Sequence, residues 1–117
     1  WNRKVEIEGM NPIGECLRNS SEAFIDRAVA DPRATKQIPD LAIRGIMLGN
    51  RFLDDMNKRL EQTQYVAGSN FSMADINLYV FLDFASWVKV IPNENHKNII
   101  KWKELVSSRE SAKVFEN

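Results

Sequence analysis

Few side chains in this sequence could combine into a reactive group. His96 is the only histidine, so a Ser-His-Asp relay would depend on a residue in a polar stretch between helical patterns. We expect a surface histidine there. One cysteine, Cys16, and one histidine cannot supply the four ligands of a structural zinc site. We expect Cys16 to be a buried, inert thiol rather than a redox site, because the spacing places no basic residue to lower its pKa.

The acidic residues do not form an acid/base pair either. Glu6 and Glu8 would lie about 200° apart around a helix and would not face each other. Asp54-Asp55 is expected to be solvated, with Lys58 and Arg59 at helical ion-pair spacing. The glycines lack the spacing of a phosphate-binding loop. The sequence therefore shows no set of residues that is spaced for catalysis.

The composition is that of an ordinary globular protein. The 117 residues fit one domain over 1–117, and 16 basic residues balance 16 acidic ones, which argues against nucleic-acid binding. No apolar run reaches the roughly 18 residues that span a membrane, no signal peptide is seen, and a lone cysteine fits a reducing compartment. We therefore expect a cytoplasmic protein that contacts neither nucleic acid nor membrane. Because the chain begins at Trp1 and not at methionine, we expect a piece of something longer.

The stretch around which the fold must be organised begins at Phe71. Ser72 is placed as an N-cap with Asp75 three residues later, which predicts a reciprocal capping box. Phe71 and Ile76 are placed as a hydrophobic staple around it. The following residues are apolar over about two-thirds of the helix circumference, so other elements must wrap this helix. We predict an all-α bundle of four to six helices around a buried central helix at about 72–90.

Three further helical segments are expected. Residues 1–31 show an interrupted helical pattern, in which Pro12 either kinks one helix or follows Asn11 as a new N-cap. The pattern over 37–62 is helical and carries an apolar stripe. A further helix is expected over 98–107, with a short tail over 111–115 that lies back over the core.

The apolar stripe of the long segment comprises Ile38, Ala42, Ile46, Gly49, Leu53, Met56 and Leu60. Gly45 and Gly49 each cost about 1 kcal/mol in a helix interior, which predicts a close crossing by a neighbouring helix. We expect Arg18 to clamp a carboxylate or the loop before Gln37, and Gly68 to take a positive φ in the turn before Phe71.

The order of these pieces is similar to a known family. The run Tyr65-Val66-Ala67-Gly68-Ser69-Asn70-Phe71-Ser72-Met73-Ala74-Asp75-Ile76 resembles the turn and cap that open the buried helix of the C-terminal domain of cytosolic glutathione transferases. Asn98-Ile99-Ile100-Lys101-Trp102 and Ser107-Ser108-Arg109-Glu110-Ser111 look like its closing helix and tail, although the family commonly has proline where Glu110 stands. Leu17-Arg18-Asn19, Ile38-Pro39-Asp40-Leu41 and Arg44-Gly45 look like a bacterial branch.

The resemblance implies a function that this chain would share with a second domain. In the family, glutathione is held and activated by an N-terminal thioredoxin-like domain, whose pattern does not occur in this sequence. The helical domain closes the pocket for a small hydrophobic electrophile and contributes to a homodimer. The chain alone would then be inactive and carry no cofactor, with glutathione as the co-substrate of the whole enzyme. The alternative is a non-catalytic interaction module, of the kind attached to translation factors, synthetases or regulators.

The resemblance also implies which residues would contact substrate. In the family the first helix lines the electrophile pocket, and in some members it reaches the partner's glutathione. The matching positions here are Trp1, Asn2, Val5, Glu6, Gly9 and Met10. The simpler interpretation is that Trp1, Val5 and Met10 pack the core.

Overall fold

The chain folds into packed helices, in agreement with the expected all-α class. The computed structural model describes residues 1–109, and the predicted tail over 111–115 lies outside them. The helices are α1 (Asn2–Lys4), a π-helix (Val5–Met10), α2 (Asn11–Ser20), a 3₁₀ turn (Glu22–Phe24), α3 (Pro39–Gln62), α4 (Met73–Ser86) and α5 (Lys97–Ser107). Within this range no β-strand forms, and only two isolated bridges occur. No helix in residues 1–109 has the length and apolar character to cross a membrane.

Residues 2–20 form one continuous helix that contains a π-helical turn. Asn11 has helical angles, φ −62° and ψ −47°, and its amide donates to the Glu6 carbonyl, so it does not cap a new helix. The π-helix ends just before Pro12, whose nitrogen has no hydrogen to donate and whose ring crowds the preceding turn. The prediction of helix as far as residue 31 was wrong. The helix stops at Ser20 because Ser21 is extended, and beyond it only the 3₁₀ turn at 22–24 is helical.

The long helix α3 crosses α2 at two glycines, as predicted. A Cβ on Gly45 would overlap the Pro12 carbonyl oxygen and lie 2.9 Å from Cys16 Cβ, and one on Gly49 would lie 2.7 Å from Ile13 Cδ1. The predicted apolar stripe is buried only in part, because the face of α3 that packs against α2 is the face that carries Gly45 and Gly49. Ile38 is 52 % and Ile46 39 % exposed, while Gly45 is buried in their place.

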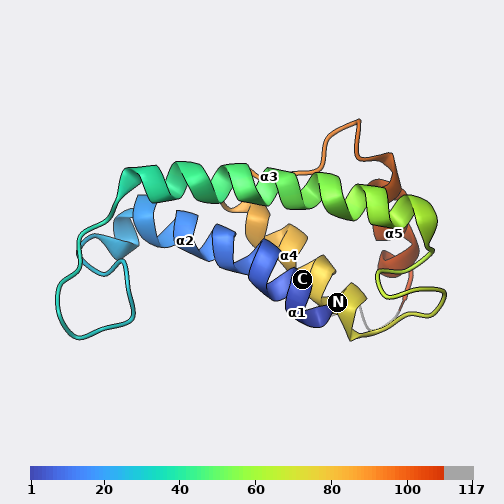
Figure 1. The fold of residues 1–117 in the computed structure, drawn as a ribbon, viewed down its shortest axis with the longest axis horizontal. Helices are drawn as coiled ribbons and strands as arrows, with labels where there is room; N and C mark the ends of the chain where they lie inside the picture. The colour runs from blue at the N-terminus through green and yellow to red at the C-terminus, as the bar shows by residue number, and fades with distance from the viewer. Residues whose placement is uncertain (110–117) are drawn as a thin grey trace.

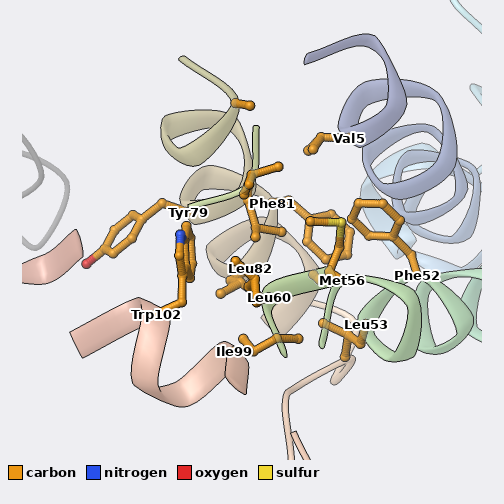
Figure 2. Close-up of a cluster of buried hydrophobic side chains, with 14 of the residues drawn as sticks. Val5, Phe52, Leu53, Met56, Leu60, Tyr79, Phe81, Leu82, Ile99 and Trp102 are labelled. Carbon is orange, nitrogen blue, oxygen red and sulfur yellow. The ribbon is translucent and has the colours of Figure 1, made fainter. Parts of the chain in front are cut away.

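The helix α4 contributes seven buried residues to the core, and it lies beside the first helix and below α3 (Figure 1). It ends at Ser86 rather than at about 90, because Lys89 takes φ +63° and the Val90 amide turns back to the Ala85 carbonyl. Side chains from the first helix, α3, α4 and α5 converge in this core (Figure 2). Its members include Val5, Ile13, Phe52, Leu53, Met56, Leu78, Phe81, Ile99 and Trp102.

The capping box at the start of α4 is present and does more than cap the helix. The Ser72 hydroxyl accepts from the first-turn amides, and the Ser72 amide donates to Asp75 Oδ2 at 2.9 Å. The second carboxylate oxygen of Asp75 accepts from the Val66 amide at 2.9 Å and from Trp102 Nε1 at 2.8 Å. The buried Asp75 therefore joins the 65–70 turn, α4 and α5. The pairing of Phe71 with Ile76 stays a prediction; Phe71 meets the Tyr65 ring edge-on, with centroids 5.9 Å apart.

The start of α5 is held by polar groups of α3, which corrects the expectation for His96. His96 is only 6 % exposed, with Nε2 2.7 Å from Asp54 Oδ1 and with Nδ1 accepting from the Asn93 amide at 3.0 Å. The prediction of a surface histidine was wrong because the 93–96 turn packs onto α3. One turn further along α3, Asn57 Oδ1 accepts from the Asn98 and Ile99 amides at 2.9 and 3.1 Å.

Candidate functional site

The π-helix contains four of the six residues expected to face a substrate: Val5, Glu6, Gly9 and Met10. Single π-helical turns are uncommon and often mark functional sites. Val5 and Gly9 are buried, and a Cβ on Gly9 would lie 2.8 Å from a Phe52 ring carbon and 3.0 Å from a Phe81 ring carbon. These two positions bring the first helix against α3 and α4, so they serve packing and are not open to a ligand.

The other candidate positions of the first helix remain accessible. Asn2 and Glu6 are exposed, and Met10 is half-buried against the core. Trp1 and Asn2 line an open hollow of about 340 Å³ between α1 and the start of α4. Ala67 and Met73 lie on its other side. Glu6 and Met10 do not line this hollow, so the structure does not gather the six candidates into one pocket.

Trp1 is held by two cations. Arg59 from α3 lies over its ring at 4.7 Å from the centroid, and Lys4 lies at 5.3 Å. Arg59 Nε also donates to the Val66 carbonyl at 3.0 Å, so one guanidinium joins α3, the 65–70 turn and Trp1. The helical spacing predicted Arg59 only as an ion-pair partner of Asp54-Asp55. No local pattern signals this contact, because Arg59 and Trp1 are far apart in the chain.

The one cysteine and the one histidine of the chain both contribute to the folded structure. Burial raises the pKa of the Cys16 thiol, which suits the inert role expected for it. Both ring nitrogens of His96 have partners, so neither is free to accept a proton from a substrate. In the described part of the chain, no three His, Cys, Asp or Glu residues lie close enough together to hold a metal ion.

The loop before Gln37 is tied to α2, but not by the side chain of Arg18. Gln37 Nε2 donates to the carbonyls of Arg18 and Ser21 at 3.0 and 2.7 Å, and the Ile38 amide donates to Asn19 Oδ1 at 2.9 Å. The expected clamp is therefore made by the Asn19 side chain and by backbone carbonyls at the end of α2. The Arg18 guanidinium instead lies back over Gly14, where a Cβ would be 3.0 Å from it.

Comparisons with known proteins agree with the fold. The family model described as "Glutathione S-transferase, C-terminal domain" matches residues 49–110. A glutathione S-transferase domain-containing protein of Dictyostelium discoideum is 38 % identical over 66 residues, which is 54 % of this chain and 24 % of that protein. The chain thus spans about a quarter of the length of this relative.

Solved structures match nearly the whole chain. A glutathione S-transferase domain-containing protein of Marinobacter aquaeolei matches with a TM-score of 0.80 and 26 % identity, over 95 % of this chain and 52 % of that one. Gtt2 of Saccharomyces cerevisiae matches with a TM-score of 0.82 at 24 % identity, over 96 % of this chain and 51 % of its own, and supports the fold alone. A Gtt2-class glutathione S-transferase of Vibrio parahaemolyticus matches with a TM-score of 0.71 and 26 % identity, over 96 % of this chain and 47 % of that one. The chain belongs to the glutathione S-transferase C-terminal domain family.

Proposed function

We propose that this chain is the substrate-pocket half of a glutathione transferase that joins glutathione to small hydrophobic electrophiles. The observation that supports this most is the division of the first helix. Val5 and Gly9 fix the helix against the core, and Trp1, Asn2 and Glu6 stay exposed beside them. Accessible aromatic and polar groups on a rigid helix are suited to orienting an apolar co-substrate next to a thiolate.

In this proposal the chemistry is divided between two halves. The thiol of glutathione is bound and ionised by groups outside this chain, and the chain contributes contacts that orient the electrophile. Trp1 and Met10 supply apolar surface, while Asn2 and Glu6 supply polar groups at its edge. The protein that carries the chain would act as a cytoplasmic homodimer, with the first helix near the interface.

The test uses the full-length protein that carries this chain and 1-chloro-2,4-dinitrobenzene as the electrophile. Trp1→Ala and Met10→Ala are expected to lower kcat/KM for the electrophile by about tenfold, the effect of losing one apolar contact in a pocket. The KM for glutathione should not change. Lys101→Ala on α5 is the matched control, because Lys101 is exposed and lines none of the hollows described.

Unchanged kcat/KM in both variants would contradict the role of the first helix. A full-length protein that neither turns over the electrophile nor binds immobilised glutathione would contradict the enzyme itself. That second result would favour the interaction module.

A further inference from the structure

One guanidinium, that of Arg59, contacts both sides of the hollow beside Trp1. It lies over the Trp1 ring, with Cζ 4.7 Å from the ring centroid, and Trp1 lines one side of the hollow. The Nε of Arg59 donates at 3.0 Å to the carbonyl of Val66, which is buried next to Ala67 on the other side. Arg59 does not itself line the hollow, so it acts on a ligand there through these two sides.

The Arg59 guanidinium has no competing partner among residues 1–109. Within this range it forms no ion pair with a carboxylate, and the bond to Val66 is the only hydrogen bond that it makes. The Val66 amide donates in turn to the buried Asp75 at 2.9 Å, so the guanidinium is bonded to a turn that is itself fixed to the start of α4. The Trp1 ring is therefore contacted by a cation whose position is set by the core.

Lys4, the second cation near Trp1, makes the weaker contact. Its Nζ is 5.3 Å from the ring centroid, close to the limit of about 6 Å for such an interaction, and it also pairs with Glu8 at 3.3 Å. The Lys4 side chain is exposed, whereas Arg59 is half-buried, and the attraction between a cation and a ring is stronger where less water surrounds it. Arg59 is thus the main fixed contact of a ring that is otherwise 41 % exposed.

We propose that Arg59 is a positioning residue, which fixes the orientation of the Trp1 ring and through it orients the electrophile beside the thiolate of glutathione. This inference rests on the function proposed above, in which Trp1 contacts the electrophile. An exposed side chain samples several rotamers, and only some of them hold a bound molecule in a geometry that can react. Fixing the ring raises the fraction of bound electrophile that is ready to react, so the effect falls on kcat more than on KM.

The first measurement asks whether Arg59 fixes the ring, and it needs no activity. The full-length protein that carries this chain is labelled with 5-fluorotryptophan, and the fluorine resonance of Trp1 is assigned by its loss in Trp1→Phe. Arg59→Met keeps an unbranched side chain without the cation, and it should shift the Trp1 resonance while leaving that of Trp87, an exposed ring at the end of α4, in place. Arg59→Lys, which keeps a cation, should shift it less. An unmoved Trp1 resonance in Arg59→Met, or equal shifts of the two rings, would overturn the proposal.

The second measurement asks whether the fixed ring affects the reaction, with 1-chloro-2,4-dinitrobenzene as the electrophile. Arg59→Met is expected to lower kcat about threefold and to leave KM for both substrates nearly unchanged. In a Trp1→Ala background the same change should alter kcat by less than about 1.5-fold, because the effect of Arg59 passes through a ring that is no longer there. Lys4→Met, the matched removal of the other cation, should lower kcat less than Arg59→Met does.

The outcomes separate this role from a general effect on stability. Equal losses of kcat in the two backgrounds would overturn the proposal, as would an equal loss in Lys4→Met. A fluorine shift in Arg59→Met without any loss of kcat would overturn this role alone. A full-length protein that lacks turnover in every form would contradict the proposed enzyme, and this role with it.

Discussion

Asp75 joins three parts of this fold. Its carboxylate is fully buried and accepts from Ser72, Val66 and Trp102, which belong to the helix start, the preceding turn and α5. The capping box alone explains only the first of these bonds. A buried donor left without an acceptor costs about 1–3 kcal/mol, so a residue that satisfies three donors matters more than an exposed cap.

We expect Asp75→Ala to lower the free energy of unfolding by about 3 kcal/mol or more, because two buried donors and one partly buried donor lose their acceptor. Ser72→Ala, which removes only the cap hydroxyl, should cost about 1 kcal/mol. Urea denaturation followed by circular dichroism measures both values. Equal losses in the two variants would mean that the bonds to Val66 and Trp102 contribute nothing.

The glycines at the helix crossing give a second prediction at this scale. Gly45→Ala should destabilise by about 1–3 kcal/mol, because its Cβ would overlap the Pro12 carbonyl oxygen and backbone cannot easily move. Gly14→Ala is the matched control, since there the Cβ meets only the end of the Arg18 side chain and helix propensity improves. Thermal unfolding should therefore rank Gly14→Ala at or above the unmodified chain and Gly45→Ala well below it.

The buried thiol of Cys16 predicts a pH dependence. Burial raises its pKa in the folded chain, so above about pH 8.5 the unfolded chain ionises this group while the folded chain does not. Stability is therefore unaffected at lower pH and falls as pH rises, by at most about 1.4 kcal/mol per pH unit. Cys16→Ala should show a shallower fall in unfolding free energy between about pH 8 and 10. Parallel curves for the two proteins would contradict this.

At the scale of elements, α5 begins with a cap supplied by another helix. Its own N-cap residue, His96, makes no capping bond, and Asn57 of α3 accepts from the Asn98 and Ile99 amides instead. This arrangement connects the formation of α5 to its docking on α3. The neighbouring contact between His96 and Asp54 fixes the turn that leads into the helix.

Asn57→Ala is expected to lower the free energy of unfolding by about 1–2 kcal/mol, the range measured for N-caps. Asn57→Asp should lose much less, because a carboxylate can accept the same amides and suits the positive end of the helix dipole. Hydrogen exchange at Ile99 and Ile100 should report the loss locally. Faster exchange spread evenly over all helices would argue against a specific cap.

At the scale of the whole molecule, the chain is a helical platform in which the one thiol is buried and both ring nitrogens of the one histidine have partners. The function proposed for the chain therefore depends on the accessible residues of the first helix. At the other end of the molecule, the 23–34 loop lines a hollow of about 610 Å³.

We expect the 117-residue chain by itself to give no measurable conjugation of 1-chloro-2,4-dinitrobenzene with glutathione. In the proposal the thiolate is stabilised by groups outside the chain, and the one buried thiol and the one engaged histidine cannot replace them. Product formation is followed by absorbance against a blank without protein. Clear turnover above the uncatalysed rate would contradict the division of chemistry between two halves.

The sequence by itself determined the features that depend on neighbours along the chain. The capping box, the positive φ of Gly68 and the span of α3 follow from residue types a few positions apart, and each is seen in the structure. The glycines of α3 also predicted a close helix crossing. Glycine destabilises a helix interior, so it is expected there where a side chain would block the neighbouring helix.

Only the tertiary structure decided the features that depend on contacts distant in sequence. His96 is buried because its turn packs onto α3 beside Asp54. The Arg59 guanidinium lies over the ring of Trp1, which belongs to a distant part of the chain. Asp75 accepts from Trp102, 27 residues away, and the six candidate positions separate into packed and accessible ones. The local sequence pattern does not indicate which residue of another helix will contact a given position, because the packing of the helices determines that contact.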